Sequence, residues 1–94
     1  MIKHMVFWKL KDENKKENMQ KIKTMLEGLS GKIDGLLNAQ VGFNFAGEEF
    51  DLALSSDFKD KESLEAYQTH PLHVAVREFI TEVRTARAVV DYEY

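Results

Sequence analysis

The sequence contains no cysteine and only one proline among its 94 residues. Without cysteine the chain can form no disulfide, no thiolate nucleophile and no cysteine-ligated zinc site, which is compatible with a cytoplasmic protein. No apolar run approaches the roughly 18 residues of a membrane-spanning helix, and the first residues do not resemble a signal peptide. The net charge of −3 comes without a basic block, so we expect neither nucleic acid nor a membrane as a partner.

The composition that remains is that of an ordinary soluble globular protein, with 44% apolar and 31% charged residues. The length predicts one domain over residues 1–94. A chain this short buries only about 60–65% of its unfolded surface, so a second copy of the chain would add stability.

The apolar periodicity predicts four strands and three helices. We expect strands over residues 1–10, 37–45, 50–58 and 86–94, and helices over 14–30, 60–69 and 71–84. The first strand carries bulky apolar residues on both faces, with Val6 and Trp8 on one side and Met5 and Phe7 on the other. A strand that is apolar on both faces is normally covered on both, which indicates a partner subunit.

The ends and faces of these elements can also be predicted. Asn14 and Glu17 resemble a capping box at the start of the first helix, and Ser30-Gly31 should end it. Asp60 should cap the second helix. In the strand over 37–45, one face is formed by Leu37, Ala39, Val41, Phe43 and Phe45. In the last helix the inner stripe holds Leu72, Val76 and Ile80, and the outer face holds Arg77, Glu78, Thr81, Glu82 and Arg84.

The element order and right-handed crossovers predict a ferredoxin-like α+β fold. This βαββαβ arrangement is a four-stranded antiparallel sheet with helices on one face. Two such sheets packed face to face would form a homodimer, a dimeric α+β barrel.

The segment from Tyr67 to His73 holds two of the three histidines and the only proline. Proline disfavours a helical residue before it and suits the first turn of a following helix, so the segment predicts a corner between two helices. His70, just before Pro71, is expected to cap or hydrogen-bond the corner locally. Imidazoles near a phenol are groups that exchange protons near neutral pH.

Several segments resemble the stress-responsive α/β-barrel, or Dabb, family nearly from end to end. They are the opening Ile2–Lys11 strand, Phe50–Leu54, Leu64–Gln68, His70-Pro71-Leu72-His73 and Val89–Tyr92. The chain departs from the family at Asp34, where members usually have proline. The resemblance implies a homodimeric barrel without implying one activity.

One plant branch of this family, olivetolic acid cyclase, closes a linear polyketide by aldol condensation. By position, its catalytic histidine falls on His73, its catalytic tyrosine on Tyr67 and a pocket histidine on His4. A second pocket histidine falls where this chain has Leu52. Some plant members hold magnesium, but no ligand set matches here, and we expect no metal and no cofactor.

Each candidate residue has a functional and a structural interpretation. His73 could act as a base and Tyr67 as a hydrogen-bond donor to an enolate, or both could pack as core residues. His4, His70 and Trp8 are candidate ligand contacts. Buried His4 alternatively pairs with a neighbouring group, and aromatic residues at strand spacing more often form a core or an interface.

Three functions remain open from the sequence. The first is a binding or stress-associated protein that holds a small hydrophobic or aromatic carbonyl compound without chemistry of its own. The second is a lyase- or cyclase-type enzyme acting on such a carbonyl compound. The third, a cofactor-free monooxygenase, rests on analogy of fold alone.

Overall fold

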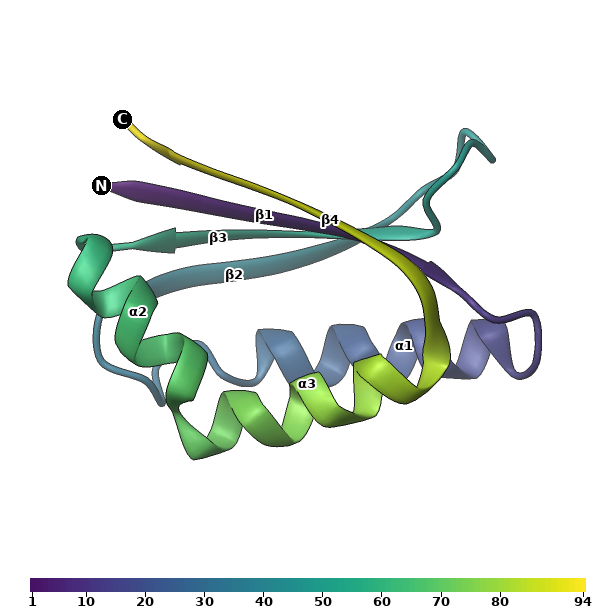
Figure 1. The fold of residues 1–94 in the computed structure, drawn as a ribbon, viewed down its shortest axis with the longest axis horizontal. Coiled ribbons are helices and arrows are strands. Elements are labelled where there is room, and N and C mark those ends of the chain that lie inside the picture. The colour runs from purple at the N-terminus through teal and green to yellow at the C-terminus, as the bar shows by residue number, and fades with distance from the viewer.

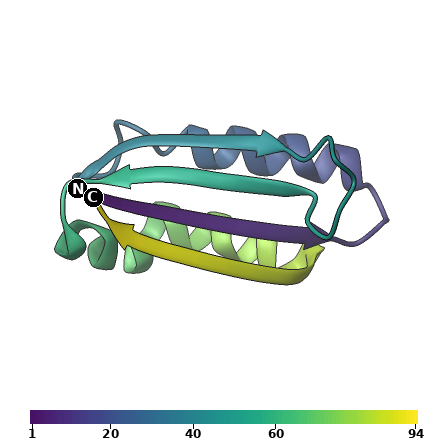
Figure 2. The ribbon, with the colours of Figure 1, turned by 90° about the horizontal axis from the view of Figure 1, so that it is seen from above.

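The computed structural model describes residues 1–94 and contains the expected elements in the expected order. They are β1 (Ile2–Leu10), α1 (Lys15–Glu27), β2 (Leu36–Phe43), β3 (Leu52–Phe58), α2 (Lys61–Thr69), α3 (Pro71–Val83) and β4 (Arg84–Glu93). The strands form one antiparallel sheet in the order β2-β3-β1-β4. All three helices cover the same side of this sheet (Figure 1), and the other side carries no helix (Figure 2). The ferredoxin-like βαββαβ prediction is confirmed.

The alternation of β1 decides what each side of the sheet presents. Ile2, His4, Val6, Trp8 and Leu10 are all buried beneath the helices. The residues between them point to the side without helices, which we call the uncovered face. The register places Met5, Phe7, Ala53, Val90 and Tyr92 on this uncovered face. One set of β1 side chains therefore packs in the core, and the other set lies on the uncovered face.

The core lies between the sheet and the helices. Ile22 and Leu26 of α1 and Val76 and Ile80 of α3 are buried in one cluster with the inward side chains of the strands. Full burial of an aliphatic side chain of this size stabilises a fold by about 1.5–3 kcal/mol. This packing fixes α3 against the sheet and sets the space between them.

The predicted capping box of α1 is wrong. Asn14 adopts the left-handed conformation, with φ of 54°, and its side chain makes no cap hydrogen bond. The helix also ends earlier than expected, at Glu27 rather than near Ser30. The Glu27 carboxylate accepts hydrogen bonds from Lys23 Nζ at 2.7 Å and from the Val41 backbone N–H at 2.9 Å. The end of α1 is thereby tied to β2.

A β-bulge changes the predicted face of β2. The register with β3 shifts between Leu36 and Asn38, so that Leu36 is 5% exposed and Leu37 is 52% exposed. An extra residue in one strand reverses the alternation on one side of the bulge. Val41, beyond the bulge, is buried as expected.

The strand β3 begins at Leu52, two residues later than predicted. Phe50 lies before it and contacts Phe7, with ring centroids 5.9 Å apart. The inward alternation of Leu52, Leu54 and Phe58 is as expected.

The start of α2 confirms the predicted cap and explains one glycine. Asp60 Oδ1 accepts hydrogen bonds from the Ser63 N–H at 2.8 Å and from the Ser63 hydroxyl at 2.6 Å. Gly35 lies against this cap with φ of 85°, and a Cβ there would be 2.2 Å from Ser63 Oγ. Residue 35 must therefore lack a side chain for α2 to begin where it does.

The corner between α2 and α3 is a single residue. His70 ends α2 and is the N-cap of α3, where its Nδ1 accepts a hydrogen bond from the Leu72 N–H at 3.1 Å. Pro71 occupies the first turn, as the sequence predicted. Leu72, expected on the inner stripe, is instead 44% exposed because the stripe begins one turn later at Val76. No helix is long and apolar enough to cross a membrane.

Candidate functional site

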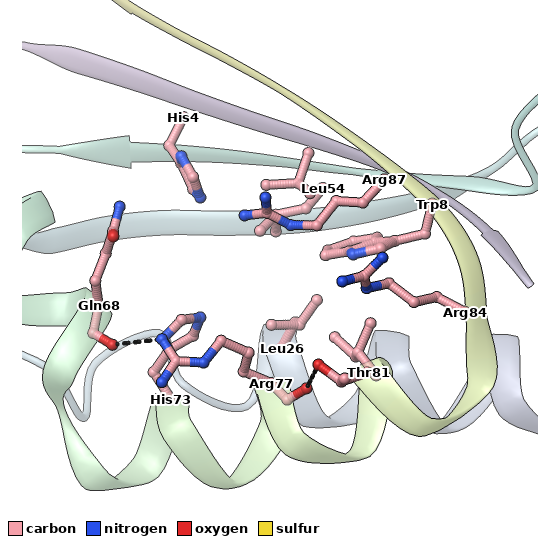
Figure 3. Close-up of a pocket in the computed structure, with 12 residues that line it drawn as sticks. His4, Trp8, Leu26, Leu54, Gln68, His73, Arg77, Thr81, Arg84 and Arg87 are labelled. Atoms are coloured by element: carbon pink, nitrogen blue, oxygen red, sulfur yellow. Dashed lines mark hydrogen bonds between the residues drawn. The ribbon is translucent and has the colours of Figure 1, made fainter.

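A cavity of about 250 Å³ lies between the sheet and α3. Its lining combines a floor of apolar side chains with polar groups from β1, β4, α2 and α3 (Figure 3). The lining residues are His4, Val6, Trp8, Leu26, Leu54, Gln68, His73, Arg77, Ile80, Thr81, Arg84 and Arg87. Small-molecule sites usually combine apolar walls with convergent polar groups, and this cavity has both, although seven of its twelve lining residues are polar or charged.

His4 forms one wall of the cavity from the middle of β1. Its side chain is buried, and its Nδ1 forms a hydrogen bond with Asp91 Oδ1. Asp91 lies directly opposite His4 in the β1–β4 register. When the carboxylate is ionised and the imidazole is neutral, Nδ1 carries the proton and Nε2 is left as an acceptor. Asp91 therefore fixes the tautomer and the orientation of His4.

His73 faces His4 from α3, on the opposite side of the cavity (Figure 3). Its Nδ1 atom is buried and has no hydrogen-bond partner. Burial lowers the pKa of His73 to about 4, and the positive charge of Arg77 acts in the same direction, whereas the Gln68 carbonyl opposes the shift. His73 is therefore a neutral imidazole at neutral pH.

Tyr67 supports His73 from behind instead of lining the cavity. The two ring centroids are 4.0 Å apart with an interplanar angle of 32°, and the Phe58 ring meets Tyr67 edge-on at 4.9 Å. Burial raises the pKa of Tyr67 above its ordinary value, so the phenol stays protonated. The two candidate catalytic residues are thus in contact, but only His73 lines the cavity.

The other candidates are divided between the cavity and the corner. Trp8 is buried and lines the cavity together with His4 and His73. His70 lies outside the lining and caps α3. No three histidine, aspartate or glutamate side chains come together as metal ligands would.

Three arginines that the sequence analysis did not select also line this cavity. Arg77 and Arg84 were predicted on the outer face of the last helix. Arg77 is exposed as predicted but also borders the cavity, whereas Arg84 is half-buried in β4 and borders the cavity with Arg87 of the same strand. They are all the arginines in the chain. At about 100° per helical residue, positions 73 and 77 of α3 lie about 40° apart, so the sequence could have placed Arg77 beside His73. Arg84 and Arg87 lie in β4, where helical spacing gives no signal.

The fold and this cavity define the class of protein: a ferredoxin-like α+β domain with a ligand-sized site between its two layers. The model of the stress responsive A/B barrel domain family, Dabb, matches residues 2–94, and the chain belongs to this family. The resemblance inferred from the sequence is thereby confirmed.

Solved structures agree with this assignment. A dimeric protein of unknown function with a ferredoxin-like fold from Bacteroides fragilis is 37% identical, covers 99% of this chain and 95% of its own, and superposes with a TM-score of 0.91. A dimeric ferredoxin-like protein of unknown function from Thermobifida fusca is 25% identical, with coverage of 99% and 90% and a TM-score of 0.87. The hydroxynitrile lyase from Passiflora edulis shares the fold at 14% identity, with coverage of 97% and 90% and a TM-score of 0.85. Comparison with curated protein sequences gave no match.

Proposed function

We propose that this protein binds a small molecule in the cavity between His4 and His73. The observation that carries the proposal is that the imidazoles of His4 and His73 face each other across a cavity of about 250 Å³ (Figure 3). A ligand that enters the cavity can contact both rings while its apolar part contacts Trp8.

An NMR titration of the three histidine rings tests this proposal, with a panel of small phenols and β-diketones as probes. Binding should shift the ring signals of His4 and His73. His70 is an internal control, because it lies outside the lining and caps α3. A panel that moves no ring signal, or that moves all three histidines equally, would contradict binding in this cavity.

A second candidate is a lyase- or cyclase-type reaction on a small carbonyl compound, and the His4–Asp91 pair favours it. A base held in one tautomer by a carboxylate is a recurring arrangement for proton transfer. His73 is the base that the sequence suggested, with Tyr67 as donor. However, the low pKa of His73 makes it a weak base, and Tyr67 lies behind it. We therefore infer that His4 Nε2 would take the proton.

The minimal step is removal of a proton from the carbon next to the carbonyl, which leaves an enolate that is then reprotonated from solvent. In deuterium oxide, a β-diketone probe would exchange that proton for deuterium faster with the protein than without it. His4→Gln should abolish the acceleration, and Asp91→Asn should reduce it. An unchanged rate with His4→Gln would refute this role for His4.

We also propose that the chain forms a homodimer through the uncovered face. That face carries Met5, Phe7, Val90 and Tyr92, and the last two are 50% and 47% exposed in the single chain. Contiguous apolar surface of this kind usually marks an interaction site. The relatives from B. fragilis and T. fusca are described as dimeric, which supports the same assembly here.

The absence of cysteine supports a cytoplasmic location.

A further inference from the structure

We propose that the ligand is a small organic anion, a single ring bearing a carboxylate that lies among Arg77, Arg84 and Arg87. This inference rests on the proposed binding function and specifies its ligand class. A planar guanidinium with several donors matches the geometry of a carboxylate.

None of the three arginines forms an ion pair within the protein, and Arg77 and Arg87 are exposed to solvent. The five ion pairs of the structure all involve lysines or His4, and none involves an arginine. The cavity lining contains no aspartate or glutamate. The chain as a whole carries a net charge of −3, so this concentration of positive charge is local to the cavity.

The carboxylate that acts on Arg87 has another role. Asp91 attracts Arg87 electrostatically, but its Oδ1 is engaged by His4 Nδ1. Arg77 donates from Nη1 to the Gln68 carbonyl at 3.0 Å, which is a neutral partner. Desolvation by neighbouring side chains and the Arg84 charge lower the pKa of Arg87, whose side chain nevertheless stays exposed. A bound anion would relieve this repulsion between like charges.

The remainder of the lining selects against a purely inorganic anion. Five of the twelve lining residues are hydrophobic, namely Val6, Trp8, Leu26, Leu54 and Ile80. A cavity of about 150 Å³ is known to accept benzene, so a cavity of about 250 Å³ has room for one ring with an acidic substituent. The apolar floor would contact the ring, and the arginines would hold the carboxylate.

A matched ligand pair tests the inference in the unaltered protein. Trp8 is the only tryptophan and lines the cavity, so its fluorescence reports occupancy directly. We expect benzoate to bind at least ten-fold more tightly than its neutral analogue benzamide. The benzoate affinity should fall as sodium chloride is raised, and inorganic phosphate should compete poorly because it has no ring.

Substitutions then locate the anion. Arg87→Gln and, separately, Arg77→Gln should reduce the preference for benzoate over benzamide at least five-fold. Lys16→Gln is the matched control, because it removes one positive charge from an exposed position on α1 that makes no ion pair. Circular dichroism verifies that each variant is folded, and the comparison of ligands in the unaltered protein needs no variant.

The outcomes separate this inference from the proposal on which it rests. Equal binding of benzoate and benzamide would overturn the anion class and leave a cavity that binds neutral compounds. A preference for benzoate that survives both arginine substitutions would overturn the assignment to the arginines. If inorganic phosphate binds as tightly as benzoate, the claim that the ligand contains a ring is refuted. If no probe binds and no histidine signal moves, binding in the cavity itself is refuted.

Discussion

The imidazole of His73 lies against the ring of Tyr67, with centroids 4.0 Å apart. Both side chains are neutral at physiological pH, since burial lowers the pKa of His73 and raises that of Tyr67. His73 therefore gives the cavity an uncharged wall, and Tyr67 packs behind it. The positive charges of the lining come from Arg77 on the same helix and from Arg84 and Arg87 of β4.

The low pKa of His73 should make the stability of the protein depend on pH. In the unfolded chain a histidine has a pKa of about 6.5, whereas in the folded protein the pKa of His73 is about 4. Between these values the unfolded state binds more protons, so stability is complete above about pH 6.5 and is lost as the pH falls toward 4. Urea denaturation measures the free energy of unfolding at each pH. Between about pH 6.5 and pH 4 this free energy should fall by about 2 kcal/mol less in His73→Gln than in the unaltered protein.

Three carboxyl groups also make stability depend on pH, because hydrogen bonds from Lys23, Lys3 and Ser63 lower the pKa values of Glu27, Asp57 and Asp60. Their contributions are lost below about pH 5, and this loss is the same in both proteins and cancels in the comparison. Parallel stability curves for the two proteins would show that His73 is not desolvated in the folded state.

A charge on the uncovered face should separate the proposed dimer. Val90→Asp places a carboxylate among Met5, Phe7 and Tyr92, where burial against a partner would leave it unpaired. We expect light scattering at micromolar concentration to change from a dimeric to a monomeric mass. Leu72→Asp is the matched control, since Leu72 is 44% exposed but lies in the helical layer. A monomeric mass for the unaltered chain, or a dimer that persists in Val90→Asp, would exclude this interface.

Two glycines with similar backbone angles should respond differently to alanine. Gly31 and Gly35 have φ of 83° and 85°, but a Cβ at Gly31 meets nothing within 4 Å, while one at Gly35 meets the Ser63 side chain. Gly31→Ala should cost about 1 kcal/mol of stability from backbone strain alone. Gly35→Ala should cost at least 1 kcal/mol more, because it also displaces the Asp60–Ser63 cap of α2. Equal losses in thermal denaturation would show that the cap tolerates the methyl group.

The regular parts of the fold were predictable because their periodicity is local. The alternation in β1 and β3 and the cap at Asp60 follow from neighbouring residues, and Pro71 fixed the corner. The bulge at Leu36–Asn38 was not predictable, because it depends on how β2 meets β3. The hydrogen bond between Glu27 at the end of α1 and Val41 of β2 likewise joins residues that are distant in the sequence.

The candidate site was predictable only in part, for related reasons. Resemblance and residue type pointed to His4, Trp8 and His73, and the structure places these three around one cavity. The His4–Asp91 contact joins residues 87 positions apart, and only the β1–β4 register creates it. Arg77 and Arg84 were assigned to the outer face because charged helical residues usually face solvent. A cavity at the edge of the sheet allows them to be hydrated and still border the site.

The strict alternation of β1 means that its length cannot change freely during evolution. His4 and Trp8 face the cavity, and Met5 and Phe7, which alternate with them, face the opposite side. Inserting or deleting one residue in this strand would exchange the two sets of side chains. The histidine would leave the cavity, and lysine side chains would point into the core. Substitutions in β1 can alter one surface at a time, whereas a change of length alters both at once. Related sequences should therefore vary in length at the connection between β2 and β3 and keep β1 constant.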